Sequence, residues 1–209
     1  MRDLGVVVDS HLCFSEHIAN IVRQAHQSAN LIHRCFTSKN SDLLVRAFKV
    51  YVRPILEFNS PVWSPSLSKD ILLIESVQRK FTKRILSMSG LTYYSRLQVL
   101  GLKSLEIRRL RTDVLLVYRI MFGMVRLNSN DRVFYLKKST TPARSQIKYV
   151  INKQRCSNNR RINFFSNRIV NLWNNLPSST TDFTSFHKFD KSLNRPNDYL
   201  LLYCKLNFI

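Results

Sequence analysis

The sequence predicts a mainly α fold, in which a helical bundle with a short N-terminal strand is followed by a smaller C-terminal α(+β) region. Two observations support this prediction. Apolar residues recur at every third or fourth position through long stretches, which is the spacing of helices with one buried face. Strand-like texture is confined to two short runs, LGVVVD at 4–9 and Gln146–Asn152. Helices are therefore expected to form the core.

The first helix is expected over residues 15–36, with Ser15 as its N-cap. The second helix is expected to begin at Ser41 as N-cap and to run to about Ile55. Pro54 has no N–H to donate, so it is expected to kink or end this helix. The apolar positions of the first helix are Ile18, Ile21, Val22, Ala25, Ala29, Ile32 and Phe36.

Prolines separate the second helix from the third. Pro61 and Pro65 are expected to prevent the helix from resuming, because each pushes the residue before it toward extended geometry. Trp63 lies between them, and a ring of that size usually packs into a core. We therefore interpret residues 51–65, YVRPILEFNSPVWSP, as a rigid elbow that anchors the flanking helices.

The third helix is expected to open at Ser68 and to be closed by Gly90. Its apolar stripe faces the core, and Arg79, Lys80, Lys83 and Arg84 fall together on the opposite side. Most charged helix faces are simply solvated, but like charges at i, i+4 repel each other. Because no acidic residue separates these four cations, phosphate contact is favoured over a solvated face.

Further helices are expected from Thr92 to Gly101, from Ser104 to Gly123, and from about Phe164 to Leu176, where Pro177 stops the last one. Trp173 lies on the apolar stripe of that last helix and is expected to be structural. Residues 186–193 suggest one more helical segment. Arg108, Arg109 and Arg111 point away from the apolar stripe of their helix and are added to the candidate nucleic-acid-binding residues.

The predicted domain limits follow the texture of the sequence. Residues 1–123 form a helical domain, 124–163 a basic, loop-rich linker with a possible short strand, 164–193 a C-terminal helical segment, and 194–209 a divergent tail. For the basic residues of 132–168, phosphate contact and a flexible solvated loop are equally supported.

Composition restricts the function classes. The chain has 209 residues, 44% of them hydrophobic, and 33 Lys+Arg against 13 Asp+Glu give a formal net charge of +20. A folded protein this basic is usually bound to nucleic acid and less often to anionic membrane. The longest apolar stretch, 199–209, is about half the length of a membrane span of roughly 20 residues. We expect no membrane partner.

The cysteines and the N-terminus indicate the compartment. Cys13, Cys35, Cys156 and Cys204 lie far apart, which favours reduced intracellular thiols over a disulfide framework. The N-terminus carries charge at once and has too short an apolar run for a signal peptide. An intracellular protein of the nucleus or cytoplasm, not a secreted one, is expected.

Residues that carry chemistry are sparse. The four glycines are dispersed, and no cluster of carboxylates is placed to hold the two metal ions of phosphoryl transfer. Cys13, His17, His33 and Cys35 match no familiar zinc spacing, and packed or solvated side chains explain them better. We expect no catalytic residue, no metal or other cofactor, and no small-molecule substrate for this chain alone.

Several segments resemble, in order, the C-terminal part of reverse transcriptases of non-LTR (LINE-type, jockey-like) retrotransposons. They are DLGVVVDSHLCFSEHI with LIHR, YVRPILEFNSPVW, IESVQRKFTKRI, YSRLQVLGLKSLEIRRLRTDVLLVYRIMFG, NFFSNRIVNLWNNLPSS and FHKF. The resemblance runs from about residue 3 to residue 193. It implies a thumb-like helical domain after the polymerase palm, then a C-terminal extension, both of which hold template and primer.

The resemblance also fixes what is missing. The palm with its paired aspartates is not in this sequence, so the Mg²⁺ of the polymerase site would belong to that palm. The expected function is a C-terminal fragment of an RNA-directed DNA polymerase that binds RNA or RNA–DNA hybrid through backbone phosphates, with the missing polymerase domains as possible partners. The alternative is a non-catalytic helical module that docks on an acidic protein.

Overall fold

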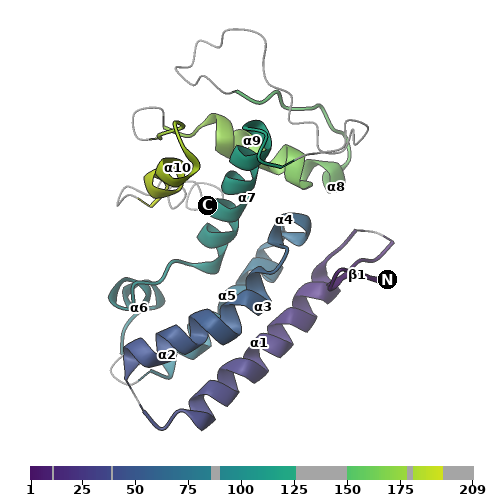
Figure 1. The fold of residues 1–209 in the computed structure, drawn as a ribbon. Helices are drawn as coiled ribbons and strands as arrows, with labels where there is room; N and C mark the ends of the chain where they lie inside the picture. Colours follow the sequence, from purple (N-terminus) through teal and green to yellow (C-terminus); the bar gives the residue numbers. More distant parts are fainter. Residues whose placement is uncertain (11, 39, 86–89, 126–149, 178–180, 195–209) are drawn as a thin grey trace. The chain divides into compact units, whose positions relative to one another are not determined.

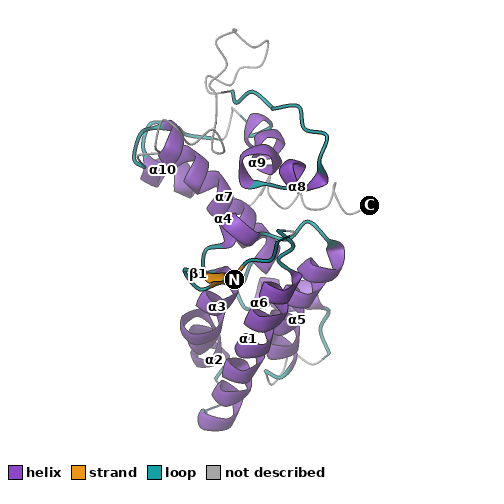
Figure 2. Cartoon of the chain, turned by 90° about the vertical axis from the view of Figure 1, so that its right-hand side faces the viewer, coloured by secondary structure: helices purple, strands orange, loops and turns teal. Residues whose placement is uncertain are grey.

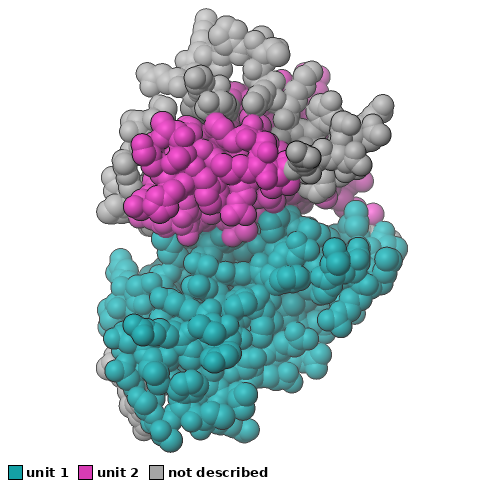
Figure 3. All heavy atoms as spheres, in the orientation of Figure 1, with its two compact units in different colours: residues 1–109 teal, residues 110–209 magenta. Residues whose placement is uncertain are grey.

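The computed structural model describes the chain except residues 11, 39, 86–89, 126–149, 178–180 and 195–209 (Figure 1). The described residues are mainly helical, with a single small pair of strands, so the predicted mainly α fold is confirmed (Figure 2). They group into two compact units, Met1–Arg109 and Leu110–Ile209, which are coloured separately in Figure 3. Each unit is described by itself below.

The N-terminus forms a small hairpin. Strand β1, Arg2–Asp3, pairs antiparallel with β2, Val6–Val7. The prediction of one strand over residues 4–9 was wrong, because the chain reverses at Leu4 (φ 43°) and Gly5 (φ 87°). Glycine takes such a positive φ without the steric cost that a side chain brings, so Gly5 is suited to the turn.

Three helical rods build the core of unit 1 (Figure 1). Helix α1 spans Ser15–Cys35 and α5 spans Ser68–Lys83. Between α1 and α5 in the sequence, the chain forms a continuous helical rod. This rod consists of α2 (Ser41–Ala47), a π-helical turn η1 (Phe48–Val52) and α3 (Arg53–Glu57). Helices α1 and α5 run parallel, because Ser15 contacts Asp70 near one end and Asn30 contacts Arg84 near the other. The predicted apolar stripe of α1 is buried apart from Phe36, which is partly buried.

The π-helical turn explains why Pro54 does not end the second helix. The backbone N–H of Arg53 bonds to the carbonyl of Phe48, five residues back, which widens the helix just before the proline. Pro54 then lies in the first turn of α3, where its missing N–H costs little. The helix therefore continues to Glu57, so the predicted end at Pro54 is wrong. The alternative that was predicted, a kink at Pro54, stays a prediction.

The elbow after α3 contains a short helix that the sequence reading excluded. Asn59 has a φ of 54°, in the left-handed region, and α4 (Ser60–Trp63) follows with Pro61 in its first turn. Pro61 thus begins a helix, contrary to the expectation that it would prevent one. Trp63 is 1% exposed, and its indole Nε1–H donates to the carbonyl of Phe58 at 2.8 Å. The predicted burial of Trp63 is confirmed.

The helix starts differ from two predicted caps. Ser15 makes no capping bond; its hydroxyl donates to Asp70 Oδ2 at 2.8 Å instead. The second helix is capped by Asn40, whose Oδ1 accepts the backbone N–H groups of Asp42 and Leu43, and Ser41 is already helical. Asn and Ser are about equally favourable N-caps. Asn40 lies one residue before Ser41, so the helix begins one residue earlier than predicted.

The end of α5 also differs from the prediction. The helix stops at Lys83 rather than continuing to Gly90, and Gly90 does not have the positive φ of a left-handed C-cap. Residues 86–89 lie outside the described residues.

Other predicted boundaries are confirmed. Thr92 caps α6 (Tyr93–Val99) by accepting the Ser95 N–H, and the Ser104 hydroxyl accepts an N–H from the first turn of α7 (Leu105–Met121). Gly101 and Gly123 both have positive φ, 57° and 71°, just after the helices they follow.

Unit 2 packs around aromatic rings. It contains α8 (Asn159–Ile162), α9 (Phe165–Asn174) and α10 (Phe186–Ser192), together with most of α7. Trp173 is fully buried, with ring centroids of Phe183 and Phe189 at 5.7 and 5.8 Å. Helix α9 ends before Pro177 as predicted, the segment at 186–193 is helical as predicted, and α8 was not predicted.

Two predictions of the C-terminal region remain open. Most of the strand-like run at 146–152 and most of the tail at 194–209 lie outside the described residues. The two compact units divide at Arg109, inside the continuous helix α7, and the domain limits predicted at 123, 163 and 193 stay a prediction.

Candidate nucleic-acid interface

The four cations predicted to share one face do so at the end of α5. Arg79, Lys80, Lys83 and Arg84 are all exposed. On the opposite side of the same turns, Val77 and Phe81 are 0% and 2% exposed and belong to the core. Burial of the apolar stripe therefore fixes which side of α5 the positive charges occupy.

Helix α1 supplies the second wall of this basic surface. A groove of about 410 Å³ lies between the two helices, and a second, of about 480 Å³, adjoins it along α1. Among the described residues, no carboxylate lines either groove. The polar residues that line them are His26, Gln27, Asn30, His33 and Arg34 from α1, and Lys80, Lys83 and Arg84 from α5. We call these residues, together with Arg79, the α1–α5 surface.

Two of the arginines are held by neighbours. Arg84 Nη1 donates to Asn30 Oδ1 at 2.6 Å, which joins the two walls of the groove. The Arg79 guanidinium lies 4.9 Å from the centroid of the Tyr93 ring. Within the described part of the chain, neither these arginines nor Lys80 and Lys83 form an ion pair. Their positive charge is therefore available to a ligand.

Three acidic residues of α3 and α5 are engaged inside the fold. Asp70 accepts from Ser15, and Glu57 accepts two hydrogen bonds from Arg108. Glu75 is 7% exposed and accepts from the Tyr93 hydroxyl and the Leu105 N–H. None of these carboxylates lines the α1–α5 grooves, so the surface keeps a single sign of charge.

The two groove histidines lose charge in the free protein. Burial is the main cause that lowers the pKa of His26, and the charge of Lys80 lowers it further. Burial also lowers the pKa of His33, with Arg84 adding to the effect and a backbone hydrogen bond at Phe81 opposing it. Both imidazoles are therefore neutral at pH 7, and only the lysines and arginines carry charge there.

We expect polyanion binding at the α1–α5 surface to tighten as the pH falls below 6.5, the ordinary imidazole value. A phosphate bound in the groove would raise the pKa of His26 and His33 from their lowered values, so its binding would take up protons. By linkage, affinity then rises as pH falls through the interval between the free and bound pKa values. Affinity measured against pH for the wild type and for His26→Gln/His33→Gln tests this.

The double variant is expected to flatten that pH profile, while His187→Gln, at an exposed position on α10, is expected to leave it unchanged. An unchanged profile in a folded double variant would contradict the assignment of these two imidazoles to the binding surface.

The three arginines predicted on α7 do not join the α1–α5 surface. Arg108 is paired with Glu57, Arg111 Nη2 is paired with Asp190 at 2.6 Å, and Arg109 is 2% exposed. Their guanidinium groups bond within the fold or are buried, so we do not assign these three arginines to phosphate contact.

Sequence reasoning missed the contribution of α1 to the surface. Gln27, Asn30 and Arg34 lie on the exposed side of α1, but nothing in the local sequence pattern places that side beside α5. The sequence signal that could have indicated it is the regular apolar stripe of each helix. When two such stripes pack against each other, the polar residues beside them border a shared groove.

Two other kinds of site are absent from the described residues. No group of three or more His, Cys, Asp and Glu side chains there is placed to hold a metal ion. In the same part of the chain, no helix has both the length and the apolar character needed to cross a membrane.

The fold and site thus define a mainly α protein with a basic groove between two parallel helices. No family model matches the chain, and no solved structure matches it. A Caenorhabditis elegans protein described as "Uncharacterized protein B0403.1" is 27% identical over 126 residues. The match covers 59% of this chain and 64% of that protein, so it spans less than two thirds of the relative's length. That description assigns no activity.

Proposed function

We propose that this chain is the nucleic-acid-holding, C-terminal part of a reverse transcriptase of the non-LTR retrotransposon type. In this proposal it binds RNA or RNA–DNA hybrid through backbone phosphates and leaves the chemistry to a polymerase palm. The observation that carries the proposal is the single-signed α1–α5 surface, which joins α5 cations to the polar face of α1. The ordered resemblance of the sequence to that family supports it.

Contact with phosphates accounts for the physical character of the surface. Lysines and arginines that neutralise phosphates release condensed counterions, which makes binding strong at low salt and weak at high salt. Such contacts position a strand without reading its bases. The proposed ligand is therefore any strand with the right backbone geometry, and sequence preference is expected to be small.

A competition titration tests the class of ligand. Labelled RNA–DNA hybrid is bound to the full chain at low salt, and unlabelled hybrid or polyglutamate of equal total charge is added as competitor. The proposal expects hybrid to displace the label at much lower concentration, because regular phosphate spacing suits a groove lined from both sides. Stronger displacement by polyglutamate would reject it in favour of a helical module that docks on an acidic protein.

A further inference from the structure

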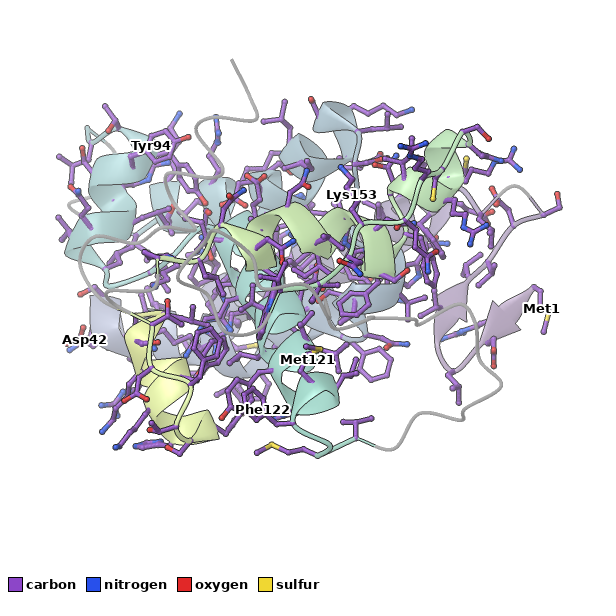
Figure 4. All side chains as sticks on the ribbon, turned by 90° about the horizontal axis from the view of Figure 1, so that it is seen from above. Met1, Asp42, Tyr94, Met121, Phe122 and Lys153 are labelled. Carbon is purple, nitrogen blue, oxygen red and sulfur yellow. The ribbon has the colours of Figure 1, made fainter. Side chains whose placement is uncertain are left out.

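Unit 2 carries a second basic surface, separate from the α1–α5 surface. It lies on the non-helical segment 150–158 and on α8, where Lys153, Arg155 and Arg160 are exposed; Lys153 is labelled in Figure 4. Between Asp131 and Asp182 the sequence has ten basic residues and no acidic one. Residues 150–158 and α8 therefore contribute no acidic side chain.

The start of the basic segment is fixed to α9 by one side chain. Asn174 accepts the Ile151 N–H through Oδ1 at 2.9 Å and donates from Nδ2 to the Ile151 carbonyl at 2.8 Å. This pair of bonds satisfies both backbone groups of Ile151, whose side chain is 1% exposed. The segment is thereby held against the helix rather than left free in solvent.

A second asparagine of α9 fixes the other end of the segment. Asn167 is 4% exposed, and its Nδ2 donates to the Arg161 carbonyl at 2.7 Å and lies 3.3 Å from Cys156 Sγ. Arg161 in turn donates to the side chain of Gln154 at 3.2 Å. The segment and α8 are thus tied to one helix while their basic side chains remain exposed.

The acidic residues in the described part of unit 2 have other partners. Asp113 is fully buried and pairs with Arg168 at 2.9 Å, Asp190 pairs with Arg111, and Asp182 accepts from Thr184. These three carboxylates are therefore engaged by side chains within the fold. A segment pinned at both ends also loses little further entropy when a ligand binds.

We propose that Lys153, Arg155 and Arg160 form a second contact surface for the phosphate backbone of a nucleic acid. This inference rests on the proposed function for its class of ligand, and it adds a site in the other unit of the chain.

The test measures the salt dependence of RNA binding by the full chain. The variant Lys153→Gln/Arg155→Gln/Arg160→Gln should reduce the magnitude of the slope of log K against log salt by about 2 to 3, at roughly 0.7 to 0.9 per phosphate contact. The matched control Lys188→Gln/Lys191→Gln removes exposed charges from α10 and should leave the slope unchanged.

A charge-preserving variant, Arg155→Lys/Arg160→Lys, should keep the wild-type slope. That result would show that the slope depends on the charge of these side chains and not on their shape. An unchanged slope in a folded triple variant would overturn the second surface while leaving the α1–α5 surface intact. If the wild type itself binds RNA without salt dependence, the proposed function fails together with this inference.

Discussion

Replacing Trp173 with alanine is expected to lower the free energy of unfolding of unit 2 by about 3–5 kcal/mol, the usual cost of truncating a buried aromatic ring. The side chain is fully buried among Phe183 and Phe189. A loss of that size is a large part of the 5–15 kcal/mol that stabilises a typical domain, estimated at order of magnitude. We therefore expect unit 2 to be partly unfolded at moderate temperature.

The two tryptophans of the chain separate the responses of the two units. Trp63 lies in unit 1 and Trp173 in unit 2. In Trp173→Ala, Trp63 fluorescence reports unit 1, while far-ultraviolet circular dichroism follows the helices of both units. We expect the dichroism signal of this variant to be lost at a lower denaturant concentration than that of the wild type. Trp173→Phe keeps an aromatic ring and should cost less.

The Trp173 prediction rests on packing alone, so its failure has a clear meaning. If the dichroism midpoint of Trp173→Ala matches that of the wild type, the ring does not contribute to a core and the description of unit 2 is wrong. The equivalent variant of unit 1, Trp63→Ala, is expected to lose a similar free energy of unfolding. In that variant the fluorescence of Trp173 reports unit 2.

Replacing Glu75 with alanine is expected to destabilise unit 1 by about 3 kcal/mol, since each buried donor left unsatisfied costs about 1–3 kcal/mol. The carboxylate accepts the Tyr93 hydroxyl and the Leu105 N–H, the latter at 3.0 Å to Oε2. It thereby ties α5 to the start of α7, where backbone N–H groups lack partners within the helix.

The burial of Glu75 determines which of its variants is expected to lower the free energy of unfolding most. Burial raises its pKa, and the bonds from Tyr93 and from the α7 backbone oppose that rise. Glu75→Gln keeps an amide oxygen for one donor and should cost less than Glu75→Ala. Glu16→Ala, at an exposed position on α1, should change stability by less than about 1 kcal/mol.

Urea unfolding followed by Trp63 fluorescence in a Trp173→Phe background measures these differences. Equal midpoints for Glu75→Ala and Glu16→Ala would contradict the role of Glu75 as a buried acceptor.

Sequence patterns predicted the long helices well because burial of a stripe repeats over several turns. The stripe of α1 from Ile18 to Ile32 is buried, and α9 and α10 lie where apolar spacing placed them. Short elements gave no such signal. Helix α8 spans only Asn159–Ile162, and each strand of the N-terminal hairpin has two residues, so neither shows a period.

The candidate site could be predicted only in part for a related reason. The cations of α5 are neighbours on one helix, so the sequence alone groups them. The partnership of Arg84 with Asn30 joins residues on different helices and depends on the parallel packing of α1 and α5. The pairing of Arg108 with Glu57 likewise depends on tertiary structure, so the polar helix face on which Arg108 lies does not reveal it.

The salt dependence of RNA binding by Arg79→Gln/Lys80→Gln/Lys83→Gln/Arg84→Gln tests the central claim most directly. Glutamine nearly preserves helix propensity, so the fold should survive, as circular dichroism can verify. The account predicts that the slope of log K against log salt becomes shallower by about 3 to 4, at roughly 0.7 to 0.9 per contact, with affinity lost equally for every sequence tested. An unchanged slope in the folded variant, or a loss confined to one RNA sequence, would contradict it.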